Sequence, residues 1–212
     1  MMNYEVLFKC APVIQINGDL VIPPTYKGDT NFIIPDQIVL FCMDQYDLTK
    51  QDVRVLDPMC GIGTIPRVIN RHGGNCMGIE LDEYRFKVAL TVSDHKKLKQ
   101  EDMLRVDCLT KHSFHCIFTS MPFDWFKQEN SGVTPDFANQ FKNLLTSDGF
   151  VLLDSVPQVN RMGETWSVAA HQCDYLEKNG FLLVAILRFN SNTETGPTES
   201  VIMKFQLTNN GH

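Results

Sequence analysis

The segment Val55-Leu56-Asp57-Pro58-Met59-Cys60-Gly61-Ile62-Gly63-Thr64 decides the fold of this chain. An apolar run ends in an acid, two glycines follow one residue apart, and a helical pattern begins at Ile65. A strand, a tight turn and a helix in this order bring the backbone close to a ligand beneath the positive end of the helix. Two glycines also suit an ordinary strand-to-helix turn, so the surrounding sequence has to decide between the two interpretations.

Strand and helix patterns alternate on both sides of this segment. The expected strands are 53–56, 76–79, 103–106, 116–119 and 149–154, and the expected helices are 65–71, 81–97, 135–145 and 165–178. Two final strands, 181–189 and 201–207, are expected to pair antiparallel at one edge. The alternation predicts an α/β fold with a mostly parallel sheet flanked by helices on both faces. Near the N-terminus, Asn17-Gly18 between apolar runs predicts a β-hairpin, and Pro35 is expected to open a helix that reaches about Tyr46.

The length and charge of the chain limit the classes of protein to which it can belong. A chain of 212 residues suits one large domain, and its longest apolar runs are too short to cross a bilayer. No basic region followed by an apolar stretch marks a secretory signal at the N-terminus, so we expect a cytoplasmic protein. The net charge of −6 argues mildly against a protein that grips long nucleic acid alone. Basic residues gather only at 96–99, which we interpret as the solvated end of a helix.

Cysteine and histidine patterns give no sign of a metal site. The seven cysteines are odd in number, form no CxxC pair and lie mostly in apolar segments, which favours reduced, buried thiols over disulfides or zinc ligands. The six histidines show neither HxH nor HExxH spacing. We therefore expect no metal.

Acidic residues follow two of the expected strands. Glu80 ends the second strand, where an acid commonly accepts hydrogen bonds from ribose hydroxyls, whereas Asp82 is expected to cap the following helix. Asp102 stands beside the third strand, where a carboxylate can accept the amino group of adenine. Asp107 is the rival for that role, and either acid also suits a surface loop.

The segment 57–66 resembles the first motif of the class I S-adenosylmethionine-dependent methyltransferases, and in particular the branch that acts on exocyclic amino groups of bases. The resemblance covers roughly residues 30–155 and implies a Rossmann-like methyltransferase fold with S-adenosyl-L-methionine as cofactor. Glu80 matches the family's ribose-binding acid and Asp102 its adenine-side acid. A dinucleotide-binding dehydrogenase would instead have a third glycine. The residues that the resemblance assigns to the cofactor are Asp57, Pro58, Met59, Cys60, Gly61, Gly63, Thr64, Glu80, Leu81, Asp102, Met103, Phe32 and Pro35.

The last two of these residues belong to a segment upstream of the glycine turn. Residues 30–35 lie where many amino-methyltransferases place a segment over the methionine end of the cofactor, and Phe32 and Pro35 would line that pocket. The alternative is a loop that packs its phenylalanine and isoleucines into the core. We expect one structural domain, with an N-terminal hairpin and cofactor-covering segment at 1–34 and the methyltransferase domain at 35–212.

A second motif, Thr119-Ser120-Met121-Pro122-Phe123-Asp124-Trp125, follows the fourth expected strand. The amino-methyltransferases have Asp, Asn or Ser here, then two prolines and an aromatic residue. The resemblance therefore implies that the Ser120 oxygen and the Met121 carbonyl accept the two N–H bonds of the target amino group. Localising its lone pair in this way activates the nitrogen, and after Pro122 the ring of Phe123 stacks on the flipped base.

Methionine at 121 departs from the family's proline, which would fix φ and stiffen the aim of the carbonyl. The motif is then a working variant, a differently specialised site or a decayed one. A strand followed by a turn with buried aromatic residues is the alternative without chemistry, and Asp124 or Trp125 are further candidates for holding a substrate.

The expected function is N-methylation of an exocyclic amino group in a DNA or RNA base. No target-recognition domain is evident, so either a partner protein supplies recognition of the nucleic acid or the substrate is small. The alternatives are an S-adenosylmethionine-binding subunit with weak or no transfer activity, and a small-molecule methyltransferase.

Overall fold

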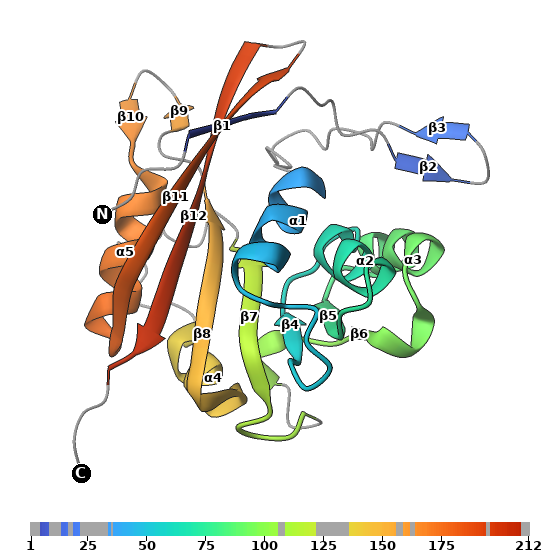
Figure 1. Cartoon of the computed structure of the whole chain (residues 1–212), viewed down its shortest axis with the longest axis horizontal. Coiled ribbons are helices and arrows are strands. Elements are labelled where there is room, and N and C mark those ends of the chain that lie inside the picture. Colours follow the sequence, from blue (N-terminus) through green and yellow to red (C-terminus); the bar gives the residue numbers. More distant parts are fainter. Residues whose placement is uncertain are drawn as a thin grey trace.

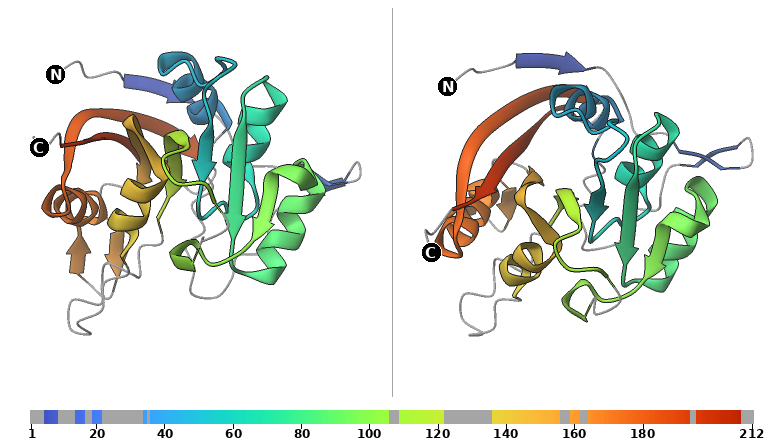
Figure 2. Two further views of the ribbon diagram at one scale, coloured as in Figure 1. Left: turned by 90° about the horizontal axis from the view of Figure 1, so that it is seen from below. Right: turned by 60° about the horizontal axis from the view of Figure 1, so that its bottom comes forward.

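The computed structural model describes residues 5–8, 14–16, 19–21, 34, 36–105, 109–121, 136–155, 159–161, 164–193 and 196–208. A twisted sheet passes through the molecule and carries helices on both faces (Figures 1 and 2). Its strands are β1 (Glu5–Phe8), β4 (Val55–Asp57), β5 (Cys76–Glu80), β6 (Leu98–Gln100), β7 (Phe114–Ser120), β8 (Leu145–Ser155), β11 (Phe181–Thr193) and β12 (Gly196–Leu207). The helices are α1 (Asp36–Gln45), α2 (Thr64–Arg71), α3 (Glu83–Val92), α4 (Phe137–Leu144) and α5 (Val168–Lys178).

The strand order is β1-β11-β12-β8-β7-β4-β5-β6. From β8 to β6 all neighbours are parallel, whereas β12 runs antiparallel to both β8 and β11. The expected α/β fold, with its mostly parallel sheet and final antiparallel pair, is confirmed. The first parallel strand, β4, lies beside both β5 and β7, so the ends of these three strands meet at one edge of the sheet.

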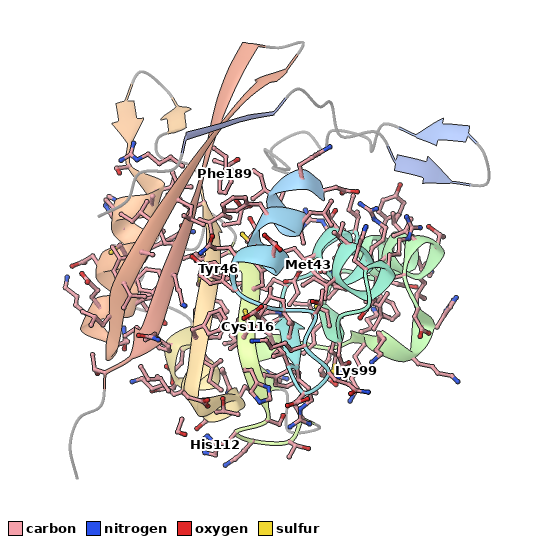
Figure 3. All side chains as sticks on the ribbon, in the orientation of Figure 1. Met43, Tyr46, Lys99, His112, Cys116 and Phe189 are labelled. Atoms are coloured by element: carbon pink, nitrogen blue, oxygen red, sulfur yellow. The ribbon has the colours of Figure 1, made fainter. Side chains whose placement is uncertain are left out.

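Successive residues of the central strands point to opposite faces of the sheet, and each face is covered by its own apolar cluster. Val55, Cys116, Phe118 and Leu152 pack with α1 and α2, and Leu56, Ile117, Val151 and Leu153 pack with α4 and α5. In Figure 3, Met43 of α1 and Tyr46, directly after that helix, lie over the sheet near Cys116 and Phe189. Burial on both faces explains why these strands are continuous apolar runs in the sequence.

Three expected element bounds were wrong. The third parallel strand is β6 at Leu98–Gln100, and Met103–Arg105 forms a 3₁₀ turn instead. The helix expected over 81–97 ends at Val92 and is followed by a 3₁₀ turn at His95–Lys97, because Asp94 caps that turn by accepting from the Lys96 amide at 3.0 Å. The lysines at 96 and 97 thus belong to that capped turn rather than to the helix. The helix expected from residue 165 begins at Val168, after the short strand β10 (Glu164–Trp166), which pairs with β9 (Val159–Arg161).

The expected N-terminal hairpin is present as β2 (Ile14–Ile16) paired antiparallel with β3 (Asp19–Val21). Ile16 pairs with Asp19, whereas Asn17 and Gly18 lie outside the described residues. The pairing of β1 with β11 was not predicted. Four of the five described cysteines are buried free thiols, at positions 42, 60, 76 and 116, in keeping with the expectation for these residues. In the described ranges, no helix has the length and apolar character that crossing a membrane requires.

Candidate functional site

The glycine turn is built at the end of β4 and is fastened to the neighbouring strand. The Cys60 amide donates to the Ile79 carbonyl of β5 at 2.8 Å, and the Gly63 amide closes the turn on the Cys60 carbonyl at 2.8 Å. Gly61 and Gly63 have φ values of +53° and +84°, a region that residues with a side chain rarely adopt. The turn then enters α2 at Thr64. The backbone conformation of the turn therefore requires both glycines, whether or not a ligand also approaches the backbone there.

Gly63 has a second requirement, which is space. A Cβ atom at Gly63 would lie 3.1 Å from the Cβ of Ala89 and 3.2 Å from the Oγ of Ser93, so α3 passes directly beside the turn. At Gly61, by contrast, an added Cβ would have no described atom within 4 Å. The first glycine of the turn faces open space, and the second faces the protein.

Glu80 links the end of β5 to this turn. One carboxylate oxygen accepts from the Gly61 amide at 2.7 Å, and the other accepts from the Asp82 amide at 2.8 Å. Glu80 is buried at 8% exposure. Each carboxylate oxygen has a second lone pair, so the group can still accept hydrogen bonds from a ligand. Asp82 caps α3 by accepting from the Arg85 amide at 2.8 Å, as expected.

Asp57, the last residue of β4, is 2% exposed, and its Oδ1 accepts from the Met59 amide at 3.3 Å. Burial, assisted by the nearby Glu80 and Asp154 carboxyls and opposed by the Met59 amide and the Thr119 hydroxyl, raises the pKa of Asp57 to about 8. None of the ion pairs between described residues includes Asp57. A buried acid of this kind is stabilised in its charged form by any cation that binds next to it.

The other residues expected to hold a cofactor surround the same edge. Pro58, Cys60 and Thr64 are buried and Met59 is partly exposed. Leu81, directly after Glu80, is a large apolar side chain that is 64% exposed. Asp102 follows β6, so it lies at the carboxyl end of a parallel strand rather than before one.

Asp102 also has a local structural role. It caps the 3₁₀ turn by accepting from the Leu104 amide at 2.9 Å, while Met103 is buried at 4% exposure. The structure thus brings the assigned residues between 57 and 103 to one edge of the sheet. Phe32, Pro35 and Asp107 lie outside the described residues.

The second motif begins at the carboxyl end of β7, beside the glycine turn. Ser120 is partly exposed, whereas Thr119 and Met121 on either side are buried at 0% and 1% exposure. Because Leu56 of β4 pairs with Ile117 of β7, the ends of the two strands are adjacent. Of this motif's later residues, Pro122, Phe123, Asp124 and Trp125 are outside the described part of the chain.

The Met121 carbonyl, expected to face a substrate, already has a protein partner. The Nε2 of Gln172, on α5, donates to it at 3.5 Å, and Gln172 is completely buried. Its Oε1 has no hydrogen-bond partner among the described residues. This contact was not predictable from the residues, because a polar residue in an amphipathic helix normally indicates the exposed face.

Asp154 is a site residue that the sequence analysis missed. It lies on β8 directly opposite Ser120 in the strand register and is 4% exposed. Burial raises the pKa of Asp154 to about 7, while the Ser120 hydroxyl acts in the opposite direction. A signal was available, because Asp154 ends the apolar run of an expected strand as Asp57 does.

Comparison with known proteins bears on the fold. No protein-family model matches the sequence, and no curated protein sequence matches it. A TehB-like S-adenosylmethionine-dependent methyltransferase from Corynebacterium glutamicum is 18% identical with a TM-score of 0.54, over 82% of this chain and 87% of that one. A candidate RNA methyltransferase from Pyrococcus horikoshii is 12% identical with a TM-score of 0.55, over 82% and 83%.

The [4+2]-cyclase SpnF is also similar, at 13% identity and a TM-score of 0.58, over 82% of this chain and 81% of that one. At such identities the likeness is one of fold. The strand order and these neighbours show that the chain has the Rossmann-like fold of the class I S-adenosylmethionine-dependent methyltransferases.

Proposed function

We propose that this chain is an S-adenosylmethionine-dependent methyltransferase whose acceptor is an exocyclic amino group of a base in DNA or RNA. The observation that carries the proposal is the position of Ser120. Its partly exposed hydroxyl ends the strand next to the glycine turn, between two buried neighbours. A hydrogen-bond acceptor therefore lies beside the turn to which we assign the cofactor, which supports the proposal.

The residues at the sheet edge fit such a cofactor. Open space lies over Gly61, the remaining lone pairs of the buried Glu80 carboxylate suit ribose hydroxyls, and the exposed Leu81 offers an apolar surface for a purine ring. Asp57 favours a cationic ligand, because burial without an ion pair leaves its charged form poorly stabilised. The bound cofactor would supply an electrophilic methyl carbon, so the protein mainly has to align the acceptor with it.

Ser120 would act on the acceptor. An amino group on a base ring is a poor nucleophile because its lone pair is delocalised into the ring. The Ser120 oxygen and the Met121 carbonyl accept its N–H bonds and so localise the lone pair. Gln172 holds the Met121 carbonyl from the side of α5, which compensates in part for the missing proline.

The same contact favours a second candidate function. A Met121 carbonyl that is already engaged by Gln172 has less capacity to accept from a substrate, which suits a cofactor-binding subunit without transfer activity. A small-molecule methyltransferase is a further alternative, and the cyclase with this fold is a reminder that the fold also serves other reactions. We also propose that a partner protein supplies recognition of the target. The chain would divide near residue 35 into an N-terminal segment and the methyltransferase domain.

Incubation with cofactor labelled in its methyl group and with separate pools of DNA, tRNA, rRNA and metabolites tests the proposal. We expect label in one nucleic acid, loss of that label in Ser120→Ala, and unchanged cofactor affinity by calorimetry. Ser147→Ala is the matched control, because Ser147 is an exposed serine near the amino end of β8. Label only in metabolites would favour the small-molecule enzyme. Cofactor binding without label in any pool would favour the binding subunit.

A further inference from the structure

The pair formed by Ser120 and Asp154 lies at the centre of the proposed site. Because β7 and β8 are parallel neighbours in register, Ser120 and Asp154 face each other across the two strands. The Ser120 hydroxyl lowers the pKa of the neighbouring Asp154 carboxyl, and Asp154 is buried while Ser120 is partly exposed. The serine therefore stands between a buried acid and the surface where an acceptor would bind.

Among the described residues, no cation forms an ion pair with the Asp154 carboxyl. The titratable groups that interact with it are the Cys42 thiol of α1 and the Asp57 carboxyl of β4, and β12 places the apolar Ile202 opposite it. None of the ion pairs among the described residues includes Asp154. A buried carboxyl without a cation destabilises a fold, and groups of this kind concentrate at functional sites.

The geometry has a direct consequence for the hydroxyl. A serine hydroxyl has one hydrogen and two acceptor lone pairs, so it accepts from an amino group best when its own hydrogen points elsewhere. An ionised carboxylate only accepts, and it therefore fixes that hydrogen. We propose that Asp154 is the positioning residue of this site: it holds the Ser120 hydrogen, so that the oxygen lone pairs face the amino group of the acceptor. This inference rests on the proposed function.

The same pair provides a route for the proton that methyl transfer releases. The bound cofactor would supply the methyl group and keep the electron pair of its carbon–sulfur bond on sulfur, so that the acceptor nitrogen, with its new carbon–nitrogen bond, would carry one proton too many. That proton moves to the Ser120 oxygen while the Ser120 hydrogen moves to the Asp154 carboxylate. The nitrogen becomes neutral, the serine is again a hydroxyl, and Asp154 is a carboxylic acid that returns its proton to water before the next turnover.

The ionised form of Asp154 is the active one in this scheme. Since the pKa of Asp154 is about 7, we expect kcat to fall as the pH is lowered through 7. Asp154→Asn keeps an oxygen that accepts from Ser120 but does not ionise, so the acidic decline should disappear. Asp154→Ala should lower kcat about tenfold to a hundredfold and leave the KM for the cofactor unchanged. Asp148→Asn is the matched control, because Asp148 is an exposed acid on the same strand.

Two measurements test the inference separately from the proposed function. Carboxyl NMR of the whole chain follows Asp154, and Ser120→Ala should raise its pKa because the hydroxyl lowers it. An unchanged pKa of Asp154 would contradict the interaction between Ser120 and Asp154, whether or not the protein transfers methyl groups. The second measurement is the pH profile of kcat with the nucleic acid found above.

The kinetic outcomes are equally decisive. Full activity of Asp154→Ala with an unaltered pH profile would overturn the positioning role. Folding of both variants is checked by circular dichroism, and Asp154→Asn, which retains the shape of the side chain, serves if alanine does not fold. If no nucleic acid becomes labelled with the native chain, the proposed function is wrong, and so is the role of Asp154 in orienting Ser120 toward an acceptor. The NMR measurement still tests whether Ser120 and Asp154 interact.

Discussion

Replacement of Asp57 by asparagine should stabilise the fold and abolish cofactor binding. In the folded chain burial raises the pKa of Asp57 from its usual 3.8 to about 8, whereas the unfolded chain retains the usual value. The protonated Asp57 therefore makes its full contribution to the stability of the fold below pH 4, and this contribution is lost as the pH rises through 8. Within this window the free energy of unfolding falls by about 1.4 kcal/mol for each pH unit, which gives about 4 kcal/mol between pH 5 and pH 8.

Urea unfolding of the native chain and of Asp57→Asn at pH 5, 6, 7 and 8 measures this effect. Asparagine keeps the shape and the acceptor for the Met59 amide but does not titrate, so the variant's advantage should grow by about 4 kcal/mol across the series. Asp148→Asn, at an exposed acid, should show no such growth. A stability difference that is the same at every pH would refute the reasoning, because it would mean that Asp57 is ionised throughout.

Three further predictions concern the glycine turn and the packing of the sheet. Gly63→Ala should lower the free energy of unfolding by about 2 kcal/mol and Gly61→Ala by about 1 kcal/mol, because both have positive φ but only Gly63 also crowds α3; equal losses in urea unfolding would contradict this. Glu80→Gln should weaken S-adenosylmethionine binding at least tenfold in calorimetry, because one of the two backbone amides that donate to the Glu80 carboxylate loses its acceptor. An unchanged affinity would show that Glu80 is not part of the cofactor site. Lys204→Met should lower the free energy of unfolding by about 1 kcal/mol, because the Lys204 ammonium lies 4.5 Å from the ring centre of Tyr46 and 4.4 Å from that of Phe150. The same loss in a Tyr46→Leu background would show that the Tyr46 ring is not involved.

The sheet was predictable because its signals are local. Burial on both faces makes each central strand a continuous apolar run, and the two glycines that end β4 mark the turn into α2 without any knowledge of the rest of the chain. The third strand was misplaced because Leu98–Gln100 is short and follows a helix almost directly, whereas Met103 is apolar and buried without being in a strand. Apolar character alone does not separate a buried 3₁₀ turn from a buried strand.

The candidate site was predictable only for residues that end strands. Asp57, Glu80 and Ser120 follow apolar runs, and parallel strands bring such residues to one edge. Asp154 depends on the pairing of β7 with β8, and Gln172 on the packing of α5 under Met121. Asp154 also ends an apolar run, but its pairing with Ser120, like the contact of Gln172, joins distant parts of the chain, which one sequence does not reveal.

A crystal structure of the chain with S-adenosylhomocysteine tests the central claim most directly. The account predicts that the ligand lies over Gly61 with its ribose at Glu80, its adenine beside Leu81 and its sulfur toward Ser120. A ligand in the reverse orientation, or side chains of the protein filling the space over Gly61, would contradict it.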